Sequence, residues 1–149
     1  MLSDSFKYLE LALHEASNAF EKDEVPVGAI VVLNNQIIGR GHNLCVSNNN
    51  PLLHAEVVAI KDACKALSNW RLDGCILYST LEPCLMCTGA IIQARITKVY
   101  FGALDENWGC ILSNYTVFDD NLFGHKVKYE FIKSEPCAEI LKEYFRGKR

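Results

Sequence analysis

The chain has 149 residues, of which 50% are hydrophobic and 22% are charged, and its formal net charge is −3. This profile is typical of a globular protein and gives no general case for binding a polyanion. No apolar run is long enough to span a membrane, and the first residues lack the apolar segment of a signal peptide, so we expect one domain over residues 1–149, located in the cytoplasm.

The first part of the chain predicts a helix followed by a β-hairpin. Apolar residues recur at the spacing of an amphipathic helix, at Phe6, Leu9, Leu13, Ala16 and Phe20. The apolar segment 25–33 predicts a buried strand, and segment 36–41 predicts a second strand. Asn34 and Asn35 form a tight turn between them, so we expect the two strands to pair.

The middle of the chain alternates between helix and strand. An asparagine-rich loop over 44–52 precedes a helix predicted over 54–67. A turn at 73–74 leads into a strand predicted over 75–81. A further helix, opened by a proline, is predicted over 83–95.

The last part of the chain adds two strands and a helix. Segment 97–102 predicts a strand, and segment 126–133 alternates as a final strand. Segment 105–120 fits either a loop or a short helix, while Pro136 opens a last helix that ends near Arg146. This order of elements implies an α/β fold in which helices cover both faces of one mixed sheet.

The seven cysteines favour a reducing compartment, because a secreted disulfide framework usually has an even number in a smaller chain. We expect most of these thiols to be small buried side chains, as at Cys64 in a helix and Cys75 at the start of a strand. Only Cys84 and Cys87 have a spacing that suggests chemistry.

A metal site is predicted from three residues at two helix starts. Catalytic zinc takes three protein ligands and leaves one position for water. His54 offers an imidazole, and Cys84 and Cys87 lie three residues apart, so both sulfurs face the same side of a helix. A helix N-terminus also favours the thiolate form of cysteine.

Glu56 is predicted to carry protons for the same site. It follows His54 by two residues within the same helical turn. Because three ligands already complete the protein's share of the zinc site, its carboxylate is free to accept a proton from the water and to return it to the substrate.

Each half of this pattern has another interpretation when taken alone. A Cys-x-x-Cys at a helix start also describes a redox motif, a His-x-Glu can be ordinary capping chemistry, and a structural zinc needs a fourth ligand. The remaining histidines, at 14, 42 and 125, lie in no comparable motif. His-x-Glu followed about thirty residues later by Pro-Cys-x-x-Cys is the signature of zinc deaminases.

The chain resembles the cytidine-deaminase-like superfamily at these motifs, and along nearly its whole length it is similar to the bacterial tRNA-specific adenosine deaminases. Similar stretches are 25–29, 41–43, 69–72, 80–84 and 144–146. The resemblance implies a three-layer α/β/α sandwich with a five-stranded mixed sheet, one Zn²⁺ per subunit, and a homodimer. It also implies hydrolysis of the wobble adenosine of a tRNA anticodon to inosine.

The resemblance also assigns residues around the metal. His54, Cys84 and Cys87 match the ligands, and Glu56 matches the proton shuttle. Substrate-binding positions of the family match Asn43, which reads the base, and Val25 and Val27 beside it. Local alternatives are a turn-capping role for Asn43 and plain strand core for Val27.

The C-terminal residues Phe145 and Arg146 resemble the family's anticodon-contacting helix, although simple packing explains Phe145 equally well. Segment 125–149 has seven basic and four acidic residues, whereas segment 1–24 has two basic and six acidic ones. This asymmetry permits a local nucleic-acid footprint, and a solvated helix face with a loose basic tail accounts for it as well.

Segment 104–110 departs from the family pattern. Asp105 keeps an acidic position, but the usual lysine is replaced and Trp108 is bulky. Loss of a cation weakens the case for phosphate binding, while Trp108 offers a stacking platform or narrows the pocket. A deaminase of a free base such as guanine or cytosine is therefore the alternative, and a redox or structural zinc protein is a third hypothesis.

Overall fold

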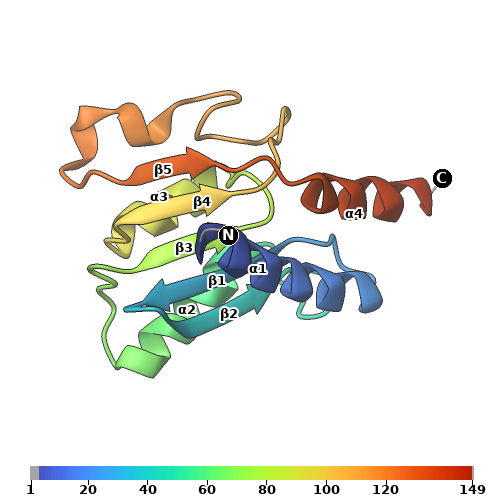
Figure 1. Ribbon diagram of the computed structural model, residues 1–149, viewed down its shortest axis with the longest axis horizontal. Coiled ribbons are helices and arrows are strands. Elements are labelled where there is room, and N and C mark those ends of the chain that lie inside the picture. The colour runs from blue at the N-terminus through green and yellow to red at the C-terminus, as the bar shows by residue number, and fades with distance from the viewer. Residues whose placement is uncertain (1–3, 149) are drawn as a thin grey trace.

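A five-stranded sheet forms the middle layer of the computed structural model, which describes residues 4–148, so that Arg149 of the basic end lies outside it (Figure 1). The helices and strands are, in chain order, α1 (Asp4–Glu21), β1 (Gly28–Leu33), β2 (Gln36–His42), α2 (Ala55–Leu67), β3 (Ile76–Ser79), α3 (Leu85–Gln93), β4 (Lys98–Phe101), β5 (Lys128–Phe131) and α4 (Glu135–Arg146). The predicted order of elements is confirmed. No described helix is long and apolar enough to cross a membrane.

The sheet is mixed, with strand order β2-β1-β3-β4-β5. β1 runs antiparallel to both β2 and β3, whereas β3, β4 and β5 are parallel. The predicted hairpin is confirmed: Asn34 and Asn35 have φ angles of 50° and 62°, and Leu33 pairs with Gln36. Two successive left-handed residues are what a two-residue hairpin loop requires, and asparagine tolerates that conformation.

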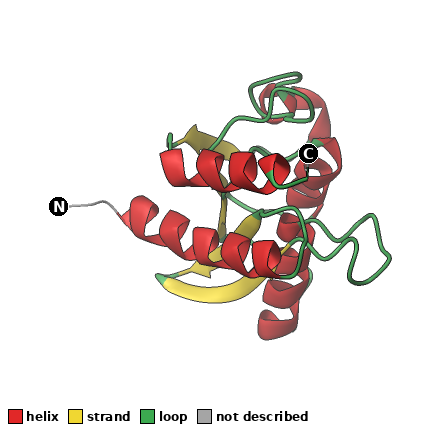
Figure 2. Ribbon diagram, turned by 90° about the vertical axis from the view of Figure 1, so that its right-hand side faces the viewer, coloured by secondary structure: helices red, strands yellow, loops and turns green. Residues whose placement is uncertain are grey.

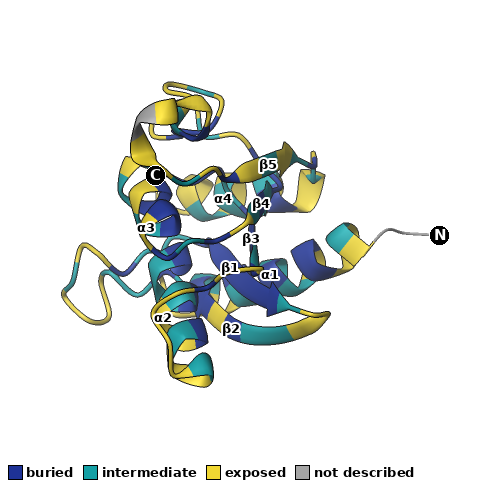
Figure 3. Cartoon of the chain, turned by 90° about the vertical axis from the view of Figure 1, so that its left-hand side faces the viewer, coloured by how far each residue is buried: buried dark blue, intermediate teal, exposed yellow. Residues whose placement is uncertain are grey.

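Helices cover both faces of the sheet, so the expected three layers are present. α1 lies on one face of the sheet, with α4 beside it and extending past the strand ends, and α2 and α3 cover the other face (Figures 1 and 2). Along β1, Ile30 packs with α1 residues such as Ala12, while Val31 packs with α2 residues such as Ala59. Because both faces are covered, β1 is apolar at every position, and Figure 3 shows it buried.

The helices approach the sheet closely through glycine and alanine. A Cβ on Gly28 would overlap the backbone of α1 at Ala12, and one on Gly41 would meet the Ala55 carbonyl of α2 at 2.5 Å. The apolar face predicted for the first helix is wrong in part, because Phe6 is 39% exposed. The buried face of α1 uses small residues beside two large ones, namely Tyr8, Leu9, Ala12, Ala16 and Ala19.

Several predicted boundaries are too long, because strand pairing stops where the neighbouring strand ends. β1 begins at Gly28 rather than at 25, and β3 ends at Ser79 rather than at 81. α3 begins at Leu85, so the preceding proline lies outside it. Segment 105–120 contains turns and a 3-10 helix (Val117–Asp119), and a second 3-10 helix (Asn121–Phe123) follows it.

Candidate metal centre and substrate cavity

Two helix N-termini meet at the predicted metal site. His54 is the N-cap of α2, with φ −68° and ψ 156°, and Cys84 is the N-cap of α3, with φ −79° and ψ 179°. Neither side chain makes a capping hydrogen bond, so both are free to point away from their own helices. The positive ends of two helix dipoles therefore face one point, which favours anionic ligands there.

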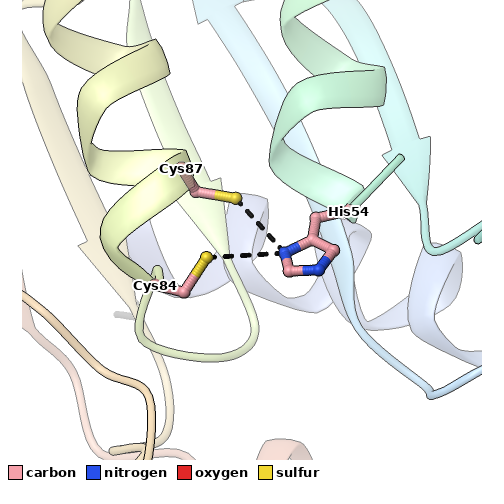
Figure 4. A group of neighbouring side chains, drawn as sticks. All are labelled: His54, Cys84 and Cys87. Carbon is pink, nitrogen blue, oxygen red and sulfur yellow. Dashed lines mark hydrogen bonds between the residues drawn. The ribbon is translucent and has the colours of Figure 1, made fainter. Parts of the chain in front are cut away.

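The three predicted ligands lie at distances that suit zinc. Figure 4 shows His54 from the start of α2 pointing at Cys84 and Cys87 of the α3 turn. Nδ1 of His54 is 3.5 Å from each sulfur, and all three donor atoms lie within 4.8 Å of one another. A tetrahedral zinc separates nitrogen and sulfur ligands by about 3.5 Å, so this donor set fits the metal. It is the one such group among the described residues.

The three ligands also polarise one another. Hydrogen bonds from Cys87 and His54 hold the pKa of Cys84 at about 4, despite burial that opposes the thiolate. The hydrogen bond to Cys84 and burial both raise the pKa of the Cys87 thiol, and the bond to Cys84 raises the pKa of His54. The lowered pKa of Cys84 favours the thiolate form, which is the form that binds zinc.

Glu56 occupies the second position of α2 and is only 4% exposed. Burial raises the pKa of its carboxyl to about 7. It lines the same cavity as the predicted ligands His54 and Cys84 without being part of the metal cluster. A carboxyl held beside a metal position with a pKa near neutrality can both accept and donate a proton.

A cavity of about 830 Å³ opens beside these four residues. It is lined by the predicted metal ligands His54 and Cys84 and by Glu56. The predicted substrate residues Val25, Val27 and Asn43 and the predicted nucleic-acid contacts Trp108 and Phe145 also line it. The fold therefore brings together segments from five parts of the chain. Arg146 is not among the lining residues; it lines a neighbouring hollow of about 390 Å³ with Leu141, Lys142 and Phe145.

Hydrogen bonds to neighbouring residues hold Asn43 in place in the cavity wall. Asn43 follows the end of β2, is 9% exposed, and donates its backbone N–H to the Val27 carbonyl at 3.3 Å. Its side-chain oxygen accepts a weak hydrogen bond from Cys45 at 3.5 Å. The amide nitrogen is left to donate into the cavity that Val25 and Val27 also line.

Two exposed aromatic side chains also line the cavity. Trp108 is 72% exposed on the turns after β4, and Phe145 is 51% exposed on α4. Sequence reasoning missed further apolar residues that line the cavity, among them Leu104 and Leu141. No spacing rule links them, because they come from a loop and a helix that only the fold brings together.

Two buried carboxylates near the cavity were also missed. Glu24 is 1% exposed and Glu82 is 2% exposed. Burial alone would raise their pKa values, but hydrogen bonds from Ser47 and Ser113, and from neighbouring backbone N–H groups, lower both. Glu82 directly precedes the Pro-Cys motif, which is the one signal that could have drawn attention to it.

The spare histidines have other partners. His42 Nδ1 lies 2.9 Å from Glu15, and its Nε2 lies 2.9 Å from the Lys22 ammonium. His125 Nε2 donates to the Ile96 carbonyl at 2.8 Å. Neither belongs to the metal cluster, as the sequence predicted.

The known proteins to which this chain is similar are deaminases. The family model of MafB19-like deaminases matches residues 3–149. A tRNA-specific adenosine deaminase of Aquifex aeolicus is 46% identical over 142 residues, covering 95% of this chain and 94% of the relative.

Two similar solved structures are also of deaminases. One, from work on A-to-I editing by tRNA:A34 deaminases at the wobble position of transfer RNA, is 42% identical with a TM-score of 0.87 and covers 91% of this chain and 99% of its own. Guanine deaminase from Bacillus subtilis is 28% identical with a TM-score of 0.65, covering 98% of this chain and 95% of its own. Similarity is thus greater to the tRNA-acting protein.

Proposed function

We infer the function of this chain from its family, because it belongs to the MafB19-like deaminases and, among them, groups with the tRNA-specific adenosine deaminases. We propose that it converts the wobble adenosine of a tRNA anticodon to inosine, with water as the second substrate and ammonia as the second product. The observation that carries this proposal is the cluster of His54, Cys84 and Cys87 beside a cavity that Glu56 also lines.

We propose that His54, Cys84 and Cys87 hold one zinc ion per subunit, since their donor atoms fit it. The chemistry that a bound zinc supplies is a lowered pKa for a water molecule, which makes a nucleophile available near neutral pH. Three ligands leave room for that water on the cavity side.

Glu56 moves the protons in this scheme. As the water oxygen bonds to C6 of adenine, Glu56 takes one proton and passes it to the neighbouring ring nitrogen. It then transfers the remaining hydroxyl proton to the amino group, which leaves as ammonia while C6 becomes a carbonyl. Its burial keeps bulk water from competing for these protons.

The cavity walls select the base. Asn43 offers an amide that can donate to or accept from a purine edge. Val25 and Val27 pack against the apolar face of the same base. Exclusion of water by such walls strengthens the hydrogen bonds made inside.

The rim selects a nucleic acid over a free base. Trp108 and Phe145 are exposed rings on which the bases that flank the target can stack, as unpaired loop bases do. Arg146 and Lys142 line the hollow next to Phe145, where they can bind phosphate. A tRNA substrate agrees with the expected cytoplasmic location.

We also propose a homodimer that forms through α3. This helix contains no charged residue, and Leu85 on it is 61% exposed. The exposed residues of α3 are Leu85, Gly89 and Gln93, so no charge on this helix opposes contact with a second copy.

The test is an assay of the purified protein on an anticodon stem-loop beside guanine, cytosine and adenosine. We expect inosine at the wobble position and no turnover of guanine or cytosine. An unmodified stem-loop together with turnover of a free base would replace this proposal with the free-base alternative.

The Trp108→Ala variant sharpens the test. Loss of a base-stacking ring costs about 1–3 kcal/mol, so KM for the stem-loop should rise roughly 5- to 150-fold. The matched control is Trp70→Ala, since Trp70 is also exposed, at 60%, but does not line the cavity. Equal effects of the two variants would argue against stacking at Trp108.

A further inference from the structure

The buried carboxylate of Glu82 binds the loop that forms one rim of the cavity. Its Oε2 accepts hydrogen bonds from the backbone N–H groups of Ile111, Leu112 and Ser113 at 3.0, 2.8 and 3.0 Å. Its Oε1 accepts from the N–H of Asp105 at 3.1 Å and from the Ser113 hydroxyl. Both ends of segment 105–113 are therefore tied to one side chain.

The hydrogen bonds continue from Glu82 to Trp108. The Oδ1 atom of Asp105 accepts from the backbone N–H groups of Asn107 and Trp108, both at 3.1 Å. The Asp105 carbonyl accepts from Gly109 at 2.9 Å. Glu82 therefore binds Asp105, and Asp105 in turn binds the backbone that carries the exposed Trp108 ring.

The same loop is attached to the metal-binding turn. Cys84 and Gly109 form an antiparallel bridge, and Cys110 donates its N–H to the Pro83 carbonyl at 2.9 Å. Gly109 lies so close to Glu82 that a Cβ there would overlap the carboxylate. Glu82 therefore sits between the rim loop and a metal ligand two residues away.

Glu24 holds a second loop in a similar way. Its carboxylate accepts from the N–H of Val46 at 3.1 Å and from both the N–H and the hydroxyl of Ser47. These bonds tie down segment 44–52, which follows Asn43. None of the ion pairs found among residues 4–148 involves Glu24 or Glu82, so N–H and hydroxyl donors balance both charges.

We propose that Glu82 is a positioning residue that fixes segment 105–113, and with it Trp108, relative to the metal ligand Cys84. A carboxylate suits this task because it offers only acceptors to donors that converge from several directions. Glutamine of the same shape turns one end into a donor that faces other donors, so part of the loop is released. The effect on catalysis rests on the proposed function, whereas the effect on the loop does not.

The loop is tested by the motion of Trp108. The chain has two tryptophans, so Trp70→Phe leaves Trp108 as the only one. In this background we expect Glu82→Gln to increase the amplitude of the fast component in the fluorescence anisotropy decay of Trp108 about twofold. Glu24→Gln is the matched control, since it releases the loop at Val46 and Ser47 and should leave the motion of Trp108 unchanged. Unchanged anisotropy in Glu82→Gln, or an equal change in both variants, would overturn the proposal.

The kinetic arm separates positioning from metal loss. We expect Glu82→Gln to raise KM for the stem-loop about 10-fold while the zinc content per chain stays at the parent value. Glu82→Asp keeps the charge and should recover part of the loss. Loss of zinc with an unaltered KM would show that Glu82 serves the metal turn instead.

Failure of the proposed function would appear separately, as no stem-loop turnover in the parent protein while the anisotropy change persists. If Glu82→Gln does not fold, Ser113→Ala replaces it, because that change removes one donor and adds none. A smaller increase in Trp108 motion is then expected, and no increase would contradict the proposal.

Discussion

The residues proposed to carry the chemistry of this protein lie at helix N-termini. His54 and Cys84 cap α2 and α3, and Glu56 and Cys87 lie within the first turn that follows each cap. Side chains at these positions project beyond the helix end, where unpaired N–H groups favour negative charge. Four reactive groups therefore reach one point without any backbone strain at the site.

Glu56→Ala tests the separation of metal binding from proton transfer. We expect the variant to keep its zinc, because three other side chains hold it, and to lose about 10²- to 10⁴-fold in kcat. Metal analysis and single-turnover kinetics measure the two properties. His54→Ala is the control that should lose zinc as well as activity. Retained activity in Glu56→Ala would exclude its role as the proton shuttle.

Among elements, the contact between α2 and the hairpin sets the position of two of the proposed active-site residues. Gly41 of β2 lies against the first turn of α2, so a Cβ there would meet the Ala55 carbonyl and the Ala59 nitrogen, both at 2.5 Å. That turn carries Glu56 and follows His54. The small residues of β2 therefore determine how far α2 stands from the sheet.

Gly41→Ala should lower both stability and zinc affinity. Overpacking of this kind costs about 1–3 kcal/mol, and relief by outward movement of α2 shifts His54 away from the cysteines. Urea unfolding and zinc competition titration measure the two effects. Gly147→Ala is the control, since a Cβ there would meet its nearest atom at an ordinary 3.5 Å. Normal zinc affinity in Gly41→Ala would show that α2 does not move.

The stability of the fold should depend on pH through Glu24, which binds the loop after β2. Burial opposes ionisation, but hydrogen bonds from Ser47 and Val46 outweigh it and lower the pKa of Glu24 below its ordinary 4.5. The folded state therefore binds this proton less readily than the unfolded state does. Glu24 stabilises the fold above about pH 4.5, and this stabilisation is lost as the pH falls through the lowered pKa.

The measurement compares urea unfolding of the parent and of Glu24→Gln between about pH 7 and about pH 3. We expect the variant to be less stable by about 1.5–3 kcal/mol at neutral pH, and the gap to close in acid. A gap that does not change with pH would mean that the charge of Glu24 contributes nothing.

In the whole molecule, the proposed dimer would place α3 at the centre of the assembly. A Cβ on Gly89 would meet no atom within 4 Å, so Gly89→Lys leaves the subunit intact while it adds a charge to the proposed interface. We expect the mass measured by light scattering to fall from that of two chains to that of one. Ser17→Lys on the exposed side of α1 should leave the mass unchanged. A dimer that survives Gly89→Lys uses another surface.

Local properties of the chain were readable before any fold was known. The ligand spacing at Cys84 and Cys87, the His-x-Glu pair at His54 and the Asn-Asn turn each lie within a few residues, so short-range geometry predicts them. The order of helices and strands followed for the same reason, although their ends did not.

Contacts between distant segments needed the packed chain. Nothing near Glu24 or Glu82 in the sequence distinguishes a buried carboxylate from an exposed one, because the donors that surround it come from other loops. The cavity that joins Asn43 to Phe145, and that leaves out Arg146, likewise arises where β2 and α4 end on the same side. Local spacing determines which side chains share a helix turn, whereas sheet order and close helix packing determine which turns meet.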